Sequence, residues 1–126
     1  MARSLSAVRP VSTEERAVLW RAIRYAPTGS DEAPSLDQID SLQVVSKCQC
    51  GCASVEFQHL KPGEIAELVA DGIGETSSGE HVGVLVFALG GKFTGLEIVG
   101  HTDDPAPLPV ASTVRGWDGQ GSLGAA

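Results

Sequence analysis

The chain has 126 residues, of which 42% are hydrophobic and 20% are charged, a composition typical of one folded domain and not of a disordered chain. A formal net charge of −7 disfavours nucleic acid as a ligand, because phosphate groups bind through lysine and arginine. No apolar run is long enough to cross a membrane, and the N-terminus has no apolar stretch typical of a secretion signal. We therefore expect a cytoplasmic protein with a single domain over residues 1–126, an ordered core over about 11–117 and a frayed end over 118–126.

The charge is distributed unevenly along the chain. Residues 1–25 contain five arginines and two glutamates, a local charge of +3, so the remaining residues carry a charge of −10. An acidic body favours encounter with a protein partner that has a basic surface. The same charge would also keep a protein soluble without any role in binding, and the sequence leaves both interpretations open.

The first predicted element is a helix. Ser12 and Glu15 have the spacing of a capping box, and Pro27 follows the expected end of the helix near Tyr25. Trp20 lies between two arginines on the side opposite to the apolar stripe, where it either anchors a protein interface or is covered by another part of the fold. The apolar positions that share the other face are Val18, Leu19, Ala22, Ile23, Tyr25 and Ala26.

The middle of the chain changes from helical to extended patterns. Ser35 begins a second capping-box pattern, which predicts one or two short helical turns after it. From Gln43 onward we expect a strand, a tight bend at Gly51 and a second strand. Residues 64–71 fit either a helix or a strand, and we prefer a strand because a polar turn and another strand follow.

A hairpin is the strongest local prediction. Gly90 and Gly91 are free to adopt the positive φ angles that a two-residue turn requires, and they join Val82–Leu89 to Lys92–Val99. Both faces of this hairpin are apolar, which predicts a central position in the sheet with the N-terminal helix covering one side. The predicted register places Leu85 opposite Leu96, Phe87 opposite Thr94, Val82 opposite Val99 and Ala88 opposite Phe93.

After Gly100 the periodic pattern ends. The proline-rich segment Asp103–Pro109 predicts a polyproline II conformation, and Trp117 is expected to fold back onto the body. Together these elements predict an α+β fold in which the N-terminal helix packs on an antiparallel β-sheet with a central hairpin at about Val82–Val99.

A cysteine cluster is the most unusual motif. Cys48, Cys50 and Cys52 could bind zinc with His59 or His81, could act as reactive thiols, or could pack as small apolar side chains at a bend. The alternate spacing argues against zinc, because alternate residues of a strand lie about 7 Å apart. We therefore prefer the structural interpretation, with no cofactor, and keep a zinc- or thiol-dependent protein as the alternative function.

The sequence contains no recognisable catalytic motif. The three histidines lack a serine or cysteine at a diagnostic spacing, and no glycine-rich loop has the pattern that holds a phosphate. A small enzyme with a site assembled from His81, His101 and Asp103 is the remaining catalytic possibility, but we lean against an enzyme.

Three segments together resemble a group of small uncharacterised bacterial proteins. The segments are Cys48–Phe57, Gly83–Phe87 and Leu96–Ile98. In that group a C-x-C-G-C-P-S segment precedes a short strand and a hairpin that ends in an L-E-V-like strand. Ala53 stands at the position of the group's proline, which weakens any claim of a rigid metal knuckle. The resemblance spans about residues 40–100 and implies a bacterial origin and an α+β fold.

The leading functional prediction is a non-catalytic acidic binding protein. Small acidic bacterial proteins of this architecture include immunity proteins that block toxin active sites, so we expect an inhibitor or immunity-type protein that neutralises a bacterial toxin or enzyme. The candidate partner-binding residues are Trp20, Asp103, Asp104 and Trp117. The expected partner is a protein with a basic surface, and neither nucleic acid nor a membrane is expected.

Overall fold

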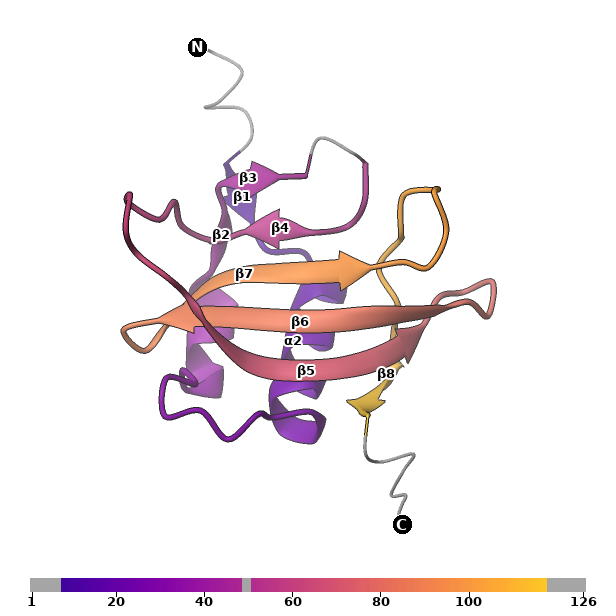
Figure 1. Ribbon diagram of the computed structural model, residues 1–126, viewed down its shortest axis with the longest axis horizontal. Coiled ribbons are helices and arrows are strands. Elements are labelled where there is room, and N and C mark those ends of the chain that lie inside the picture. The colour runs from indigo at the N-terminus through magenta and orange to yellow at the C-terminus, as the bar shows by residue number, and fades with distance from the viewer. Residues whose placement is uncertain (1–7, 49–50, 118–126) are drawn as a thin grey trace.

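The computed structural model describes residues 8–48 and 51–117, and it has the expected α+β architecture. Its main sheet contains six strands in the order β3-β4-β7-β6-β5-β8, and every neighbouring pair is antiparallel (Figure 1). A second sheet consists of β1 and β2. The elements are β1 (Arg9–Pro10), α2 (Thr13–Tyr25), the 3-10 helix η1 (Leu36–Ser41), β2 (Gln43–Val44), β3 (Ser46–Lys47), β4 (Val55–Glu56), β5 (Glu67–Glu75), β6 (His81–Leu89), β7 (Lys92–Val99) and β8 (Val110–Gly116).

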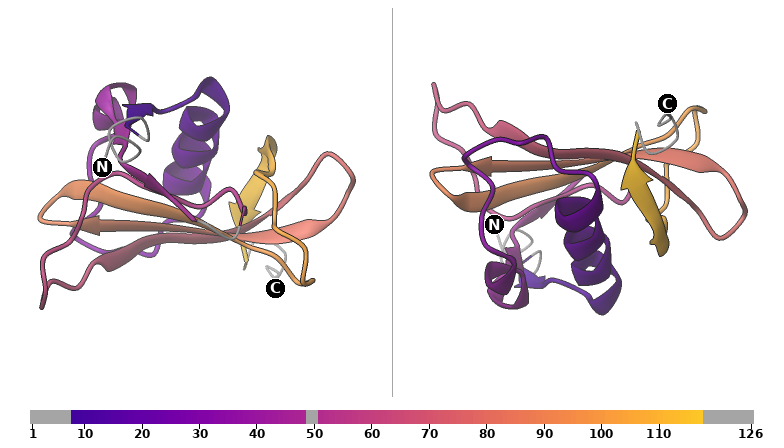
Figure 2. Two further views of the ribbon diagram at one scale, coloured as in Figure 1. Left: turned by 90° about the horizontal axis from the view of Figure 1, so that it is seen from above. Right: turned by 90° about the horizontal axis from the view of Figure 1, so that it is seen from below.

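Both helices lie on the same side of the main sheet (Figure 2). Alternate residues of the central strands face them, because side chains of a strand point in turn to opposite faces. The buried residues of the core on this side include Val18, Leu19, Ala22, Val84, Val86, Leu96 and Ile98. Within the described residues, no helix is long and apolar enough to cross a membrane.

Helix α2 begins and ends where the sequence predicts. The Ser12 hydroxyl accepts a hydrogen bond from the Glu15 amide at 3.0 Å, and the Glu15 carboxylate accepts one from the Ser12 amide at 2.8 Å. Tyr25, which the sequence places on the apolar stripe of the helix, is 48% exposed. This last turn lies at the β5–β8 edge of the sheet, where the Arg21 guanidinium covers the Tyr25 ring at 4.3 Å.

The second capping box does not form. The Ser35 hydroxyl donates to the Asp37 carboxylate instead of accepting from a backbone amide, and the helical turns that follow are of the 3-10 type. The bend at Gly51 is present, with a φ of 94° and a hydrogen bond from its amide to the Cys48 carbonyl. The segment for which helix and strand competed is a strand from Glu67, which confirms the preferred interpretation.

The hairpin of β6 and β7 is central, as predicted, but its register changes partway along. Gly90 and Gly91 have φ angles of 62° and 77°, and Ala88 pairs with Phe93. A bulge next to Ala88 then shifts the pairing by one residue, so Val86 and not Leu85 lies opposite Leu96. The remaining pairs of the shifted register are Phe87 with Gly95, Leu85 with Glu97, Val84 with Ile98 and Gly83 with Val99.

The bulge has a clear physical reason. In the unshifted register Glu97 would share the buried face with Val84 and Val86, where an unpaired carboxylate is costly. After the shift, Leu96 and Ile98 pack against the helix layer, while Glu97 is exposed on the other side. The side-chain pattern of β7 therefore overrides the register that the two-residue turn would set alone.

Strand β8 was not predicted. Its residues follow the proline-rich segment and have weak alternation, and the strand pairs with β5 through an irregular register at the edge of the sheet. Arg21 holds this edge by donating from Nη2 to the carbonyl oxygens of Ser112, at 2.9 Å, and of Val114, at 3.1 Å. The expected frayed end, residues 118–126, lies outside the described residues.

Substitution of Gly91 by valine tests the hairpin turn. We expect the free energy of unfolding to fall by about 1–2 kcal/mol, because a β-branched residue resists positive φ. Urea denaturation measures the change, and Lys92→Val, one residue later at an exposed strand position, is the matched control. If the two variants unfold at the same urea concentration, the positive φ at position 91 does not disfavour a β-branched residue.

Candidate protein-binding face

The side of the main sheet that faces away from α2 and η1 has no helix over it in the described part of the chain (Figure 2). We call it the open face. The pairings of the central strands place apolar and acidic side chains on it in adjacent rows. Its apolar residues are Leu68, Ile73, Leu85, Phe87 and Val99, and its acidic residues are Glu56, Asp71, Glu75 and Glu97.

The apolar residues of the open face are partly accessible to solvent. Leu68, Leu85 and Phe87 are of intermediate exposure, and Val99 is 45% exposed. A depression of about 350 Å³ continues this surface beside the loop between β4 and β5. Its walls include Phe87, Leu60 and Ile65, and Ile65 is 81% exposed. A concave apolar surface of this kind suits a side chain of a partner protein.

The open face is acidic. It carries four carboxylates and two cationic side chains, those of Arg115, which pairs with Ile73 across β5 and β8, and Lys92, which pairs with Leu89 at the turn end of β6 and β7. Glu75 lies between two basic groups, with its Oε2 3.5 Å from Arg115 Nη2 and 3.5 Å from His81 Nε2. Glu56 Oε1 lies 3.9 Å from His59 Nδ1, so Asp71 and Glu97 are the carboxylates of this face that make no ion pair within the described residues.

Trp117 lies at the β8 edge of the open face. Its indole Nε1 donates a hydrogen bond of 2.8 Å to Oδ1 of Asp71, so the side chain folds back onto the body as expected from the sequence. The ring remains 42% exposed and lines a depression together with Tyr25 and Pro27. Asp71 was not among the predicted site residues, because nothing in the sequence near Asp71 indicates its hydrogen bond to Trp117.

Trp20 lies on the helix layer, away from the open face. Trp20 is 40% exposed, and the Arg24 guanidinium stacks on its ring at 4.9 Å. It lines a depression with two aspartates of η1, Asp37 and Asp40. The structure thus does not bring Trp20 together with Trp117, and the two predicted anchors belong to different surfaces.

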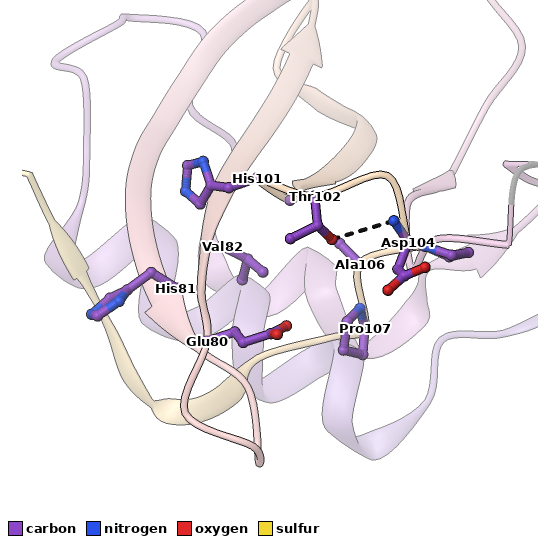
Figure 3. A pocket seen from close by; sticks show the side chains of 10 residues that line it. Glu80, His81, Val82, His101, Thr102, Asp104, Ala106 and Pro107 are labelled. Atoms are coloured by element: carbon purple, nitrogen blue, oxygen red, sulfur yellow. Dashed lines mark hydrogen bonds between the residues drawn. The ribbon is translucent and has the colours of Figure 1, made fainter.

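The predicted Asp103 and Asp104 lie in the loop between β7 and β8 and are exposed. Asp104 lines a pocket of about 260 Å³, and its amide donates to Thr102 Oγ1 at 3.3 Å (Figure 3). The same pocket is lined by His81 and His101, but Asp103 is not among its lining residues. One pocket therefore gathers most of the residues that the sequence proposed for a small enzyme.

The geometry of this pocket does not assemble a catalytic pair. Figure 3 shows the His81 ring directed away from Pro107, on the side opposite to the Asp104 carboxylate. Within residues 8–48 and 51–117, no hydrogen bond joins either imidazole of the pocket to a hydroxyl group, which a base and nucleophile require. His81 instead contacts Glu75 on the open face.

Two of the three cysteines are described. The Cys52 thiol donates to Ser54 Oγ at 3.4 Å, and this hydroxyl accepts from the Ile98 amide at 2.9 Å, which ties the bend to β7. Cys48 follows β3, and Cys50 lies outside the described residues. Among the residues that the structure describes, no group of three or more His, Cys, Asp or Glu side chains is placed to hold a metal ion.

Comparisons with protein-family models, with curated proteins and with solved structures gave no match to this chain.

Proposed function

We propose that this chain is a non-catalytic acidic binding protein of the bacterial cytoplasm. In this proposal the open face docks on a basic surface of a bacterial toxin or enzyme and inhibits it, in the manner of an immunity protein. The observation that carries the proposal is the set of carboxylates that surrounds an exposed apolar surface on the open face. Interfaces with an apolar centre and a charged rim bind specifically, because the rim selects the partner by its charge.

The helix layer carries charges of both signs. Arg16, Arg21 and Arg24 of α2 lie on the same layer as Glu14 and Glu15 of α2 and Asp37 and Asp40 of η1. The orientation of the complex in this proposal therefore depends on the apolar rows and carboxylates of the open face, to which a basic partner is attracted. Asp103 and Asp104 are exposed in the loop after β7, and in this proposal their charge would raise the rate of association.

Charge reversal on the open face tests the proposal. The immobilised chain and its Glu97→Lys variant are exposed to a lysate of the native cell, and the captured proteins are quantified by mass spectrometry. Glu14→Lys, at an exposed position in the first turn of α2, is the control because it changes the net charge equally. We expect a basic protein that both the wild type and Glu14→Lys capture and that Glu97→Lys does not.

The captured protein is then purified and its association rate is measured by stopped flow. The rate should fall steeply as salt rises, since the screening length shrinks from about 30 Å at 0.01 M to about 8 Å at 0.15 M. If the partner is an enzyme or toxin, its activity should fall as it is titrated with wild type and not with Glu97→Lys. Equal capture by all three chains, or self-association in sedimentation as the only interaction, refutes the proposal.

A further inference from the structure

A second depression, of about 450 Å³, lies where the end of α2 meets the edge formed by β5 and β8. Backbone contacts hold its walls in place. The Asp71 amide donates to the Ala26 carbonyl at 2.9 Å, and Gly72 pairs with Gly116 across the two strands. The residues that line it are Tyr25, Ala26, Pro27, Thr28, Asp71, Gly116 and Trp117.

The depression combines an aromatic ring with a carboxylate in a fixed arrangement. The 2.8 Å hydrogen bond from Trp117 Nε1 to Asp71 Oδ1 sets the orientation of the indole and keeps the carboxylate beside it. A cation placed there meets the negative face of the indole and a full negative charge together. Pro27 supplies an apolar wall for the methylene groups of a long side chain. Tyr25, 48% exposed, lines the depression beside it, with the Arg21 guanidinium stacked on its ring at 4.3 Å.

The three exposed aromatic side chains of the described residues, Trp20, Tyr25 and Trp117, differ in one respect. Arg24 stacks on Trp20 at 4.9 Å, and Arg21 stacks on Tyr25 at 4.3 Å, so both rings already hold a cation of the chain itself. In the described part of the chain, no guanidinium or ammonium group stacks on Trp117. Trp117 is therefore the ring that offers its face to a cation from outside.

We propose that the depression formed by Trp117, Asp71, Tyr25 and Pro27 receives a lysine or arginine side chain of the protein partner. This inference rests on the proposed function, because it places one basic residue of the partner at the β8 edge of the open face. Asp71 belongs to both surfaces: it lies opposite Leu85 in the open face and accepts the indole hydrogen bond in the depression. The partner's cation would thus bind at the margin of the interface, next to the apolar rows.

Small cations test the depression without the partner. The chain has two tryptophans, so its ¹⁵N spectrum has two indole signals, and a Trp20→Phe variant assigns them. The probes are Nα-acetyl-lysine methylamide and Nα-acetyl-arginine methylamide, with Nα-acetyl-norleucine methylamide as the neutral control. We expect the Trp117 signal to move in a saturable manner with both cationic probes and not with norleucine, while the Trp20 signal stays in place.

Two variants connect the depression to the partner. Asp71→Asn keeps an acceptor for the indole but removes the charge, and Trp117→Ala removes the ring. Each should weaken binding of the captured partner by about tenfold, mainly through faster dissociation. No response of Trp117 to the cationic probes, an equal response to norleucine, or unchanged partner kinetics in both variants overturns this inference.

The outcome also separates this inference from the proposed function. If Glu97→Lys abolishes capture of the partner while Asp71→Asn and Trp117→Ala leave it unchanged, the open face binds the partner and the depression holds no cation. If capture is unaffected by all of these variants, the proposed function fails as well. Circular dichroism of each variant confirms that it is folded before binding is compared.

Discussion

Replacing Gly72 with alanine is expected to lower the free energy of unfolding by about 3 kcal/mol, since overpacking of a site that cannot relax costs this much. A Cβ atom at position 72 would lie 2.4 Å from the carbonyl oxygen of Arg115 and 2.8 Å from the Ala26 Cβ. The first neighbour is backbone of β8 and the second is the residue that caps α2, so neither can rotate away. Relief of the clash must separate β5 from β8 or lift the end of the helix.

Gly83→Ala is the matched control for this prediction. Gly83 lies in the neighbouring strand β6, and a Cβ there meets Val99 Cβ at 3.5 Å, an ordinary van der Waals contact. The control should stay within about 1 kcal/mol of the wild type, because alanine lowers the conformational entropy of the unfolded chain at no steric cost. Urea denaturation measures the free energy of unfolding of both variants. A decrease of similar size in both would contradict the prediction, because the clash at position 72 would then have no specific effect.

The sequence predicted the elements whose signals are local. The capping box of Ser12 and Glu15 defines the start of α2 with four residues, and Gly90–Gly91 defines the hairpin turn with two. Both patterns act through contacts within a few residues, so they can be recognised without knowledge of the rest of the fold.

One local pattern fails, the capping box at Ser35, and the other errors concern contacts between distant parts of the chain. The bulge beside Ala88 depends on which face of β7 meets the helix layer, and β8 becomes a strand because β5 and Arg21 hold it. Tyr25 continues the apolar stripe of α2, but it lies at the edge of the sheet and remains exposed. These contacts leave no signal in the local sequence pattern from which the elements were predicted.

The candidate site was predicted only in part. Exposed tryptophans are a general signal of interfaces, and this signal found Trp117 but could not separate it from Trp20, which lies on the other layer. The apolar residues on both faces of β6 predict its central position in the sheet, but they do not show that Leu85 and Phe87 are of intermediate exposure. Asp71 and Glu97 both lie opposite Leu85, one in each neighbouring strand. An acidic residue at these strand positions is the sequence signal that could have identified the open face.

The ion pair between Glu15 and Arg9 provides a second large effect on stability. The Glu15 side chain is 9% exposed, and its carboxylate accepts two hydrogen bonds from the Arg9 guanidinium, each of 2.9 Å, as well as the one from the Ser12 amide. Glu15→Ala removes both the capping box and the pair, and it leaves Arg9 without its partner. We expect a loss of about 2–3 kcal/mol in the free energy of unfolding, and Glu14→Ala, one residue earlier and exposed, should change it by about 0.5 kcal/mol or less.

The contribution of Glu15 should also depend on pH in a defined direction. Burial raises the pKa of this carboxyl, but the hydrogen bonds from Arg9 and Ser12 and the charge of Arg9 outweigh it, so the pKa in the folded state lies below its ordinary value of 4.5. A carboxyl with a lowered pKa stabilises the fold fully at any pH above the pKa of the unfolded state, and this stabilisation is lost as the pH falls through the pKa of the folded state.

Glu15→Gln keeps the size of the side chain and cannot titrate. The difference in unfolding free energy between the wild type and Glu15→Gln should therefore be constant at neutral pH and become smaller as the pH falls below 4.5. Urea denaturation across the acid range measures it, and a difference that grows on acidification would show that the Arg9 pair does not stabilise the charged carboxylate.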